Sequence, residues 1–460
     1  MMDLGFETIG NATLIAYDGG RPVLVTDPWI AGSPYFGSWT FSHEIPAEQM
    51  AAIEGSEFVW LSHGHPDHLN QESLSRLRDK TILLPNHVGQ IIWEGLRDRG
   101  YRVRILEDNV WTKLSDKIRV LCICDMNQDG VLLVDINGRL IVDLNDGSAI
   151  GWKWYLRKLI RQAPVSFLLK LFAGEADMRN FFDEQGNRLP LVPKSERAPL
   201  GGIIQHDAEH LGVSYVIPFS SFHKMQRADS VWVQEYIHEP EEYANGFASQ
   251  RARLLPAFVR FDCVRDTWTM INASRTPDVL FQPEDFGDNW SEPLTGDDVI
   301  RARKYFQSIE HLSDSFDFIN LRVGGKDHSI DLAKKKFNRG VTFEAPRGSL
   351  MCAVDNEIFD DMLIGNFMKT TLHGDWGPGG LYPDFCPYVP KYADNGRAKT
   401  ERELDAYFAE YRRRMGWRGA IDLMRDQIEA RSKNLLRSYV SRESAVYKAT
   451  EHIYHRLRRL

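Results

Sequence analysis

The sequence predicts a mixed α/β protein built from packed layers, and three observations lead to this prediction. Short runs of β-branched residues are separated by turn signals in the first third of the chain, as on either side of the turn at 18–20. Helical patterns then intervene between further strands, near 71–79 and 87–99. The length of 460 residues exceeds what one hydrophobic core usually supports, so we expect more than one domain.

The order of elements after the first hairpin supports layers rather than a strict strand–helix repeat. Further strands are expected at 57–61, 118–124, 131–136 and 140–144. Residues 150–185 differ, because aromatic and aliphatic residues alternate there with basic ones. We interpret this stretch as two amphipathic helices around Pro164. They form either a packing layer or a lid over an active site.

Changes in composition and residue pattern divide the chain into three parts. We expect a catalytic domain over 1–239, an α+β accessory domain over 240–395 and a helical segment over 396–460. A capping box, Thr400 with Glu403, predicts the start of the last helix, and glycines near 416–419 predict a break in it.

Bulk composition excludes some classes of protein. The net charge of −8 argues against a nucleic-acid binder, which usually carries a basic surplus. The first residues lack the pattern of a secretory signal, and no apolar run is long enough to cross a bilayer. The five cysteines are odd in number and form no CxxC pair, which favours a reducing cytoplasm.

The strongest chemical signal is a run of four metal-ligand residues directly after a predicted strand. His63, His65, Asp67 and His68 lie within six positions. Imidazole suits zinc and iron, and a loop at a strand end can turn these side chains onto one small region. With two metals, His63 and His65 hold one ion, and Asp67 and His68 hold the other. The alternative is an ordinary polar surface loop.

The spacing HxHxDH after a strand resembles the signature of the metallo-β-lactamase superfamily. The upstream segment 25–29, with Asp27, resembles that family's first motif, in which an aspartate supports the metal loop. Within the superfamily the chain most resembles the metallo-β-lactamase-like part of CMP-N-acetylneuraminate hydroxylase and its bacterial relatives. The resemblance implies an αββα sandwich, here with a C-terminal α+β extension and terminal helices. One departure is that the sequence has no CxH…CxxH ligand set for a Rieske cluster.

The resemblance implies further ligands downstream of the first cluster. Asp146 stands where the family has an aspartate that bridges two metals, although it also fits an ordinary turn. Asp125 stands where the family usually has a histidine, and Asp129 is its rival. The last ligand is a histidine after the final strand of the fold, a place that His223 takes.

Two other histidines offer an alternative last ligand. His206 and His210 are four residues apart on a predicted helix, where they share one face or form a polar stripe. The expected metal ligands are His63, His65, Asp67, His68, Asp125, Asp146 and His223. Asp67 and Asp146 are also the expected catalytic residues.

Two enzyme classes and one binding class remain open for this ligand set. Because carboxylate oxygens are hard ligands, a set with three of them suits iron better than a histidine-rich dizinc site does. We therefore favour two iron ions, with zinc as the alternative. We therefore expect a diiron, O₂-dependent monooxygenase that hydroxylates a small organic or amphiphilic substrate with electrons from an external donor. The alternative enzyme is a dizinc hydrolase of an ester, amide or phosphoester. The third class is a binding protein without metal. Membrane contact is disfavoured, and a homodimer through the last helix stays open.

Overall fold

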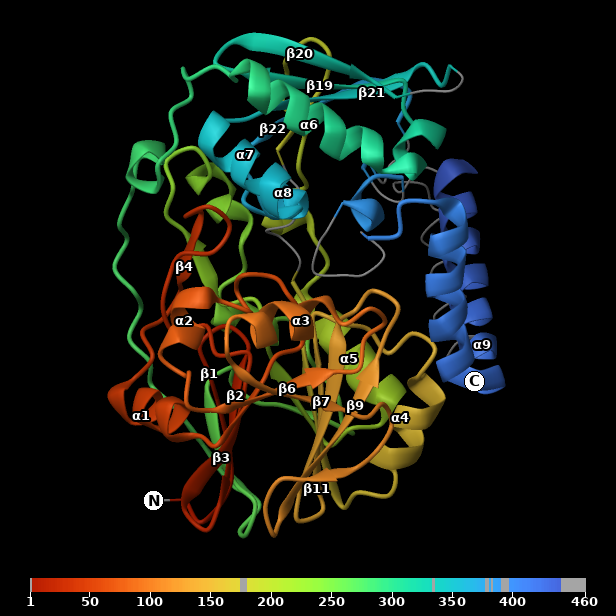
Figure 1. Cartoon of the computed structure of the whole chain (residues 1–460). Helices are drawn as coiled ribbons and strands as arrows, with labels where there is room; N and C mark the ends of the chain where they lie inside the picture. Colours follow the sequence, from red (N-terminus) through yellow and green to blue (C-terminus); the bar gives the residue numbers. More distant parts are fainter. Residues whose placement is uncertain are drawn as a thin grey trace.

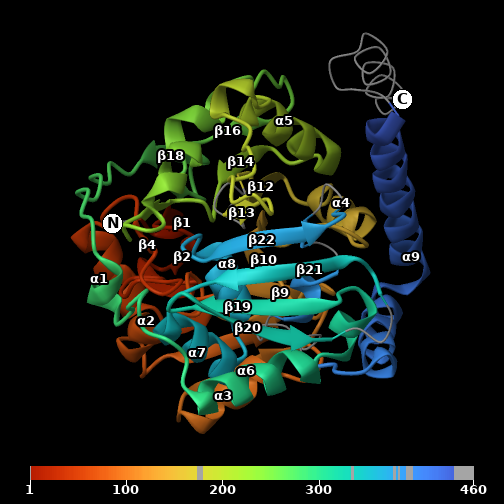
Figure 2. The same ribbon diagram turned by 90° about the horizontal axis from the view of Figure 1, so that it is seen from above.

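The computed structural model describes residues 2–173, 180–332, 336–376, 380–381, 384–389 and 397–439, with side chains up to residue 425. A sandwich of two large sheets forms the lower part of the molecule in Figure 1, and a smaller α+β unit lies above it. The long helix α9 (Glu401–Tyr439) runs along the side of the sandwich, as Figure 2 also shows.

The first large sheet combines an antiparallel and a parallel half. Its strand order is β18-β17-β1-β2-β3-β5-β6-β7. Neighbours pair antiparallel from β18 to β3 and parallel from β3 to β7. The strands are β1 (Leu4–Ile9), β2 (Thr13–Asp18), β3 (Arg21–Thr26), β5 (Phe58–Trp60), β6 (Thr81–Pro85), β7 (Arg102–Leu106), β17 (Val259–Asp262) and β18 (Thr267–Met270).

The second large sheet has the order β16-β14-β12-β11-β10-β9-β8. The predicted hairpin around Asn137 joins β10 and β11, with Asn137 at φ 48°. The strands are β8 (Thr112–Lys113), β9 (Ile118–Cys124), β10 (Gly130–Ile136), β11 (Arg139–Asn145), β12 (Val165–Lys170), β14 (Tyr215–Pro218) and β16 (Arg253–Leu254).

Helices cover the outer faces of both large sheets and complete an αββα sandwich, which confirms the predicted fold class (Figure 1). The helices α1 (Ala47–Gly55), α2 (Gln71–Ser75) and α3 (Ile91–Asp98) lie on the first sheet, and α4 (Lys153–Ile160) and α5 (Leu200–Leu211) lie on the second. Phe6 of β1 packs against Phe167 of β12 with ring centroids 5.0 Å apart, so the inner faces share one core. Burial of this apolar surface is the main force that holds the two sheets together.

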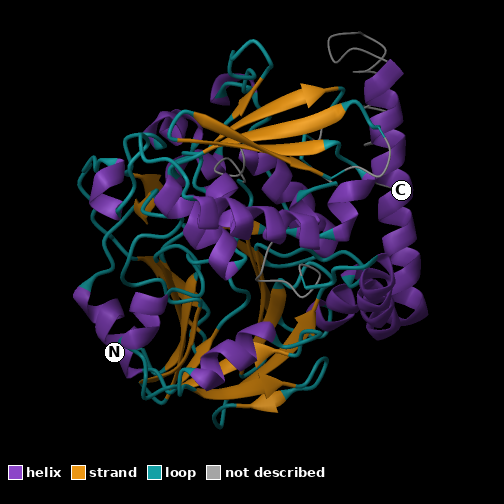
Figure 3. Ribbon diagram, turned by 45° about the horizontal axis from the view of Figure 1, so that its top comes forward, coloured by secondary structure: helices purple, strands orange, loops and turns teal. Residues whose placement is uncertain are grey.

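The smaller unit has a five-stranded sheet and a separate core. Its strand order is β13-β22-β21-β19-β20. Helices α6, α7 and α8 lie between this sheet and the sandwich, as Figure 3 shows, with Phe306, Phe343 and Phe359 in the core. The elements are β13 (Phe181–Phe182), β19 (Phe318–Val323), β20 (Lys326–Asp331), β21 (Arg339–Glu344), β22 (Lys369–Gly374), α6 (Gly296–Ser308), α7 (Arg347–Asn356) and α8 (Phe359–Ile364).

The remaining elements are short or peripheral. Strands β4 (Trp39–Phe41) and β15 (His223–Met225) form a two-stranded ribbon. The 3-10 helices are Lys194–Glu196, Val231–Tyr236, Pro240–Ala244, Pro283–Phe286, Glu310–Asp314 and Cys386–Tyr388. Thr400 and Glu403 exchange the predicted capping hydrogen bonds, and Gly416 breaks the helical dihedrals of α9 at φ 65°. Among the described residues, no helix is long and apolar enough to cross a membrane.

Three sequence-based expectations differ from the structure, and the structure decides one alternative that the sequence left open. The expected boundary at 239/240 falls before β16, β17 and β18, which belong to the sandwich sheets, while β13, within 150–185, joins the smaller unit. The second helix expected around Pro164 is the buried strand β12, because a strand covered on both faces reads as a continuous apolar run. Trp152 is buried in the sandwich core, as expected for the packing layer that was the alternative to a lid. The helix expected at 87–99 begins only at Ile91.

Candidate metal centre

The candidate ligands follow strand ends that meet at one edge of the sandwich. The loop from His63 to His68 follows β5, and Asp27 follows β3, the parallel neighbour of β5. Asp27 accepts hydrogen bonds from the backbone N–H of Ser62 (2.8 Å) and from Nδ2 of Asn145 (2.5 Å). Its carboxylate is 3.5 Å from Nδ1 of His68. Asp27 therefore supports the metal loop and leaves Nε2 of His68 to face the centre.

Three atoms converge around the first two histidines. Nε2 of His63 is 2.9 Å from Nδ1 of His65 and 3.8 Å from Oδ2 of Asp146. Ligand atoms about 2.1 Å from one ion are about 3–3.5 Å apart in neighbouring positions. These atoms can therefore hold one ion after small movements.

A second set of contacts involves the same oxygen of Asp146, and the ligand atoms of His63, His68 and Asp146 all lie within 4.8 Å of one another. Nε2 of His68 is 3.2 Å from Oδ2 of Asp67 and 3.4 Å from Oδ2 of Asp146. Tyr35 donates to Asp67 at 2.5 Å and Asn11 donates to it at 2.9 Å, so the carboxylate is held in place. Because Oδ2 of Asp146 lies near both groups, Asp146 is placed to bridge two ions.

His223 of β15 lies beside the second group with both ring nitrogens open. It is 6% exposed and stacks on Trp39, and neither nitrogen has a hydrogen-bond partner among the described residues. Burial lowers the pKa of His223 to about 3, while the nearby charge of Asp67 opposes this effect. A buried imidazole without partners is costly unless it ligates a metal or binds water. A cavity of about 370 Å³ opens beside this histidine.

The alternative last ligands lie elsewhere in the molecule. His206 and His210 stack on each other on α5, with ring centroids 6.0 Å apart. Helix α5 covers the second sheet, and neither residue belongs to the groups of converging ligand atoms found among the described residues.

Asp125 closes its own loop rather than joining either group. Its Oδ1 accepts the backbone N–H groups of Asn127 (2.9 Å) and Asp129 (3.1 Å). Burial raises the pKa of Asp125 to about 7, against the effect of these hydrogen bonds. For Asp129, burial and the charges of Asp125 and Asp146 raise the pKa, and histidines of the centre oppose the rise. Asp129 is therefore within electrostatic reach of the centre.

Parts of the chain are similar to known proteins. No protein-family model matches the sequence. The chain is similar to cytidine monophosphate-N-acetylneuraminic acid hydroxylase from Asterias rubens, with 27% identity over 136 residues, which are 28% of this chain and 21% of the relative. The enzyme of that name from Danio rerio is 27% identical over 137 residues, 28% of this chain and 23% of its own length. The match thus spans about a fifth of these relatives.

The chain has the αββα sandwich of the metallo-β-lactamase fold, with a histidine-rich loop at a strand end (Figure 1). Among solved structures, the diiron β-hydroxylase CmlA from Streptomyces venezuelae matches 57% of this chain and 54% of its own, at 14% identity and a TM-score of 0.39. A metallo-hydrolase from Ignicoccus hospitalis matches 58% of this chain and 99% of its own, at 11% identity and a TM-score of 0.35.

Burial and neighbouring charges act differently on the histidines of this centre. Burial and the charges of His68 and His65 lower the pKa of His63 well below its ordinary value. Burial also opposes protonation of His68, but the charges of Asp67 and Asp146 raise its pKa well above that value. The two neighbouring imidazoles thus differ: the carboxylates favour a proton on His68, while His63 favours its neutral form, which is the form that binds a metal.

Two carboxylates at the centre could not be predicted from their spacing in the sequence. Asp360 and Asp361 lie on α8 of the smaller unit, and their ligand atoms lie within 4.8 Å of His65 and of each other. Two adjacent acids between Phe359 and Met362, in an otherwise apolar helix, were the only local hint. Acids almost never stay buried without a partner, so such a pair is a candidate functional group.

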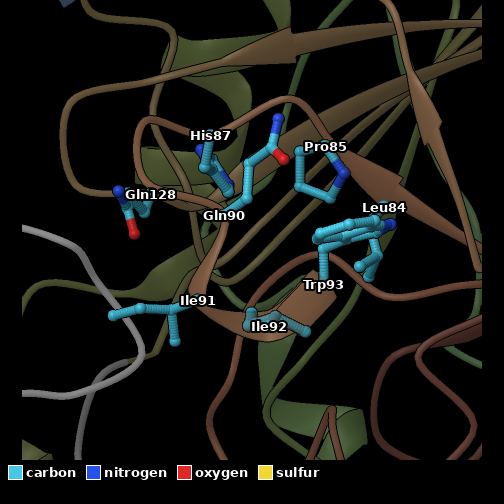
Figure 4. A pocket seen from close by; sticks show the side chains of 8 residues that line it. All are labelled: Leu84, Pro85, His87, Gln90, Ile91, Ile92, Trp93 and Gln128. Carbon is cyan, nitrogen blue, oxygen red and sulfur yellow. The ribbon is translucent and has the colours of Figure 1, made fainter. Parts of the chain in front are cut away.

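His87 is another residue that sequence analysis did not assign to the centre. It lies within electrostatic reach of His63, and its Nδ1 is 3.3 Å from the hydroxyl of Tyr411 on α9. Burial lowers the pKa of His87 to about 3. Figure 4 shows His87 with Gln90 and Gln128 around a pocket whose other lining is mostly apolar. Helix α9 thus packs against the loops that flank the centre.

Proposed function

We propose that this protein is a dinuclear metal enzyme that hydroxylates a small organic substrate with O₂, and that iron is its metal. The observation that carries the proposal is the pair of ligand groups that share Asp146. His63 and His65 would hold one ion, and Asp67 and His68 would hold the other, with His223 beside the second. Bound iron would supply the redox chemistry that activates O₂.

The side chains around the ligands would hold this centre in place during turnover. Asp27 and Asn145 fix the orientation of His68, while Tyr35 and Asn11 fix Asp67. In the overall reaction one oxygen atom enters a C–H bond of the substrate and the other leaves as water. Two electrons and two protons balance this reaction, and a separate donor protein would deliver the electrons.

Iron is favoured by the oxygen donors near the histidines. Asp67 and Asp146 lie within the two groups, and Asp129 is within electrostatic reach, at the loop where the family usually has a histidine. Carboxylates are hard ligands and suit iron better than a site made mainly of imidazoles. The names of the matched relatives, which are hydroxylases, support the same choice.

A dizinc hydrolase is the second candidate, and His223 is the observation that favours it. With both of its ring nitrogens open, His223 would bring the number of imidazoles to four. Imidazole-rich sites with open positions are typical of hydrolytic zinc. Its substrate would be an ester, amide or phosphoester.

Metal analysis of the purified full chain tests the proposal. We expect about two irons per chain and an optical spectrum that changes on reduction and on exposure to O₂. The variant His63→Ala should lose iron, and the matched control His210→Ala should keep it, because His210 lies on α5. Two zincs without a redox response would replace the oxygenase by the hydrolase. A wild-type chain that binds no transition metal would overturn both.

A further inference from the structure

The smaller unit contacts the candidate centre at His65, through a carboxylate of helix α8. Nε2 of His65 is 3.1 Å from Oδ2 of Asp360 on α8, and the two residues are 295 positions apart in the sequence. The other nitrogen, Nδ1, faces Nε2 of His63 at 2.9 Å. His65 therefore lies between a carboxylate of the smaller unit and the ligand atoms of the sandwich.

Helix α8 is anchored firmly beside the centre. Ile364 at its end packs in a small core with Trp29 and Tyr35 of the sandwich. The indole N–H of Trp232 donates to the backbone carbonyl of Asn366 at 3.2 Å.

A buried arginine secures the turn that follows α8. The guanidinium of Arg227, which is fully buried, lies 4.1 Å from the ring centre of Phe367 and donates to the carbonyl of Phe36. These contacts join the two units over the metal loop and fix the position of Asp360.

We propose that Asp360 is a positioning residue for the metal centre, so that the smaller unit sets the orientation of a ligand held by the sandwich. A carboxylate that accepts the N–H of one imidazole nitrogen fixes the tautomer, turns the other nitrogen toward the metal and makes it a better ligand. With Nε2 of His65 held by Asp360, Nδ1 is the nitrogen that faces His63. This inference rests on the proposed metal centre.

Asp361 offers a matched comparison on the same helix. It is 8% exposed against 7% for Asp360, but its carboxylate has no hydrogen-bond or ion-pair partner among the described residues. If the aspartates bound an ion directly, both would be needed. If Asp360 acts through His65, only Asp360 should matter for metal affinity.

The test compares Asp360→Asn with Asp361→Asn in the full chain. Metal affinity is measured with zinc and with ferrous ion under argon, in competition with a chromophoric chelator. We expect Asp360→Asn to lower the affinity for one of the two ions about 10–100-fold. Asp361→Asn should change either affinity less than about threefold. In excess chelator both variants should still unfold in one cooperative transition, which separates positioning from folding.

Each other outcome overturns a distinct statement. Two ions bound with unchanged affinity in Asp360→Asn would overturn this inference and leave the proposed function standing. Loss of one whole ion in both variants would also overturn it and assign direct coordination to both aspartates. A wild-type chain without metal would overturn the proposed function itself. If Asp360→Asn does not fold, Asp360→Glu replaces it, because glutamate keeps the charge but places it one methylene further from the backbone. This variant should still lower the affinity for the same ion.

Discussion

The buried carboxylates of the smaller unit and those of the candidate centre have different partners. In the smaller unit, Asp298 lies against Arg301 and Arg347, and Asp288 lies against Arg227. At the candidate centre, the buried aspartates have histidines, hydroxyls, amides or no partner. Within the part of the chain that the structure describes, none of Asp67, Asp146, Asp360 and Asp361 forms an ion pair with lysine or arginine.

This difference separates carboxylates that stabilise the fold through arginine from carboxylates that are candidates to bind a metal cation. A buried carboxylate without a cation is costly, and an arginine removes much of that cost permanently. The centre instead leaves its negative charge to protonated histidines, which can give up their protons when a metal binds. The predictions that follow test this comparison, from the largest expected effect to the smallest.

Removing the arginine of the buried pair should have the largest effect on stability. We expect Arg227→Met to lower the free energy of unfolding by about 3–5 kcal/mol, because it leaves Asp288 buried without its cation. Denaturant unfolding measures the change. The control Arg301→Met should cost less than about 1 kcal/mol, since this side chain is 40% exposed. Equal costs for the two variants would break the comparison.

Removing the shared ligand should abolish stabilisation by metal. Wild-type protein with free metal at 100–1,000 times its dissociation constant should gain about 2.7–4.1 kcal/mol over protein in chelator. In Asp146→Asn most of this gain should vanish, because Asp146 faces both groups of ligand atoms. Thermal unfolding with and without metal measures it. An undiminished gain in this variant would remove Asp146 from the centre.

A pH titration should show the structural role of Asp298. Although burial opposes its ionisation, Arg347, Thr295 and Arg301 hold the pKa of Asp298 well below its ordinary value of 3.8. The stabilisation is therefore complete above the unfolded-state pKa and is lost as the pH falls toward the folded-state pKa.

At pH 7 we expect Asp298→Asn to cost about 1.5–3 kcal/mol, and the cost should shrink below about pH 4. Unfolding midpoints between pH 3 and 7 measure the trend. The exposed Asp297, changed in the same way, is the control. A cost that does not depend on pH would contradict the ionic role.

The smallest effect should come from the carboxylate without a partner. In metal-free protein, Asp361→Asn should leave stability unchanged or raise it by about 1 kcal/mol, because burial and the charge of Asp360 disfavour this carboxylate more than His65 favours it. Thermal unfolding in chelator measures the change. A loss of more than about 1 kcal/mol would place Asp361 with the structural carboxylates instead.

Much of the fold and the first cluster of candidate ligands could be predicted from local sequence. The hairpin at Asn137 and the capping box at Thr400 were predicted because these signals depend on residues a few positions apart. The strand at 165–170 was mistaken for helix, because burial of both of its faces removes the alternation by which strands are recognised. The expected ligands remain predictions until metal is measured.

The sequence by itself determined the sandwich class and the ligand loop from His63 to His68, since four donors within six positions at a strand end must lie close together. Only the tertiary structure decided that β17 pairs with β1, and that Asp125 closes its own loop. It also decided that Asp360 reaches His65 from 295 positions away. Contacts of this kind depend on how two separately formed cores dock, and no local spacing rule describes docking.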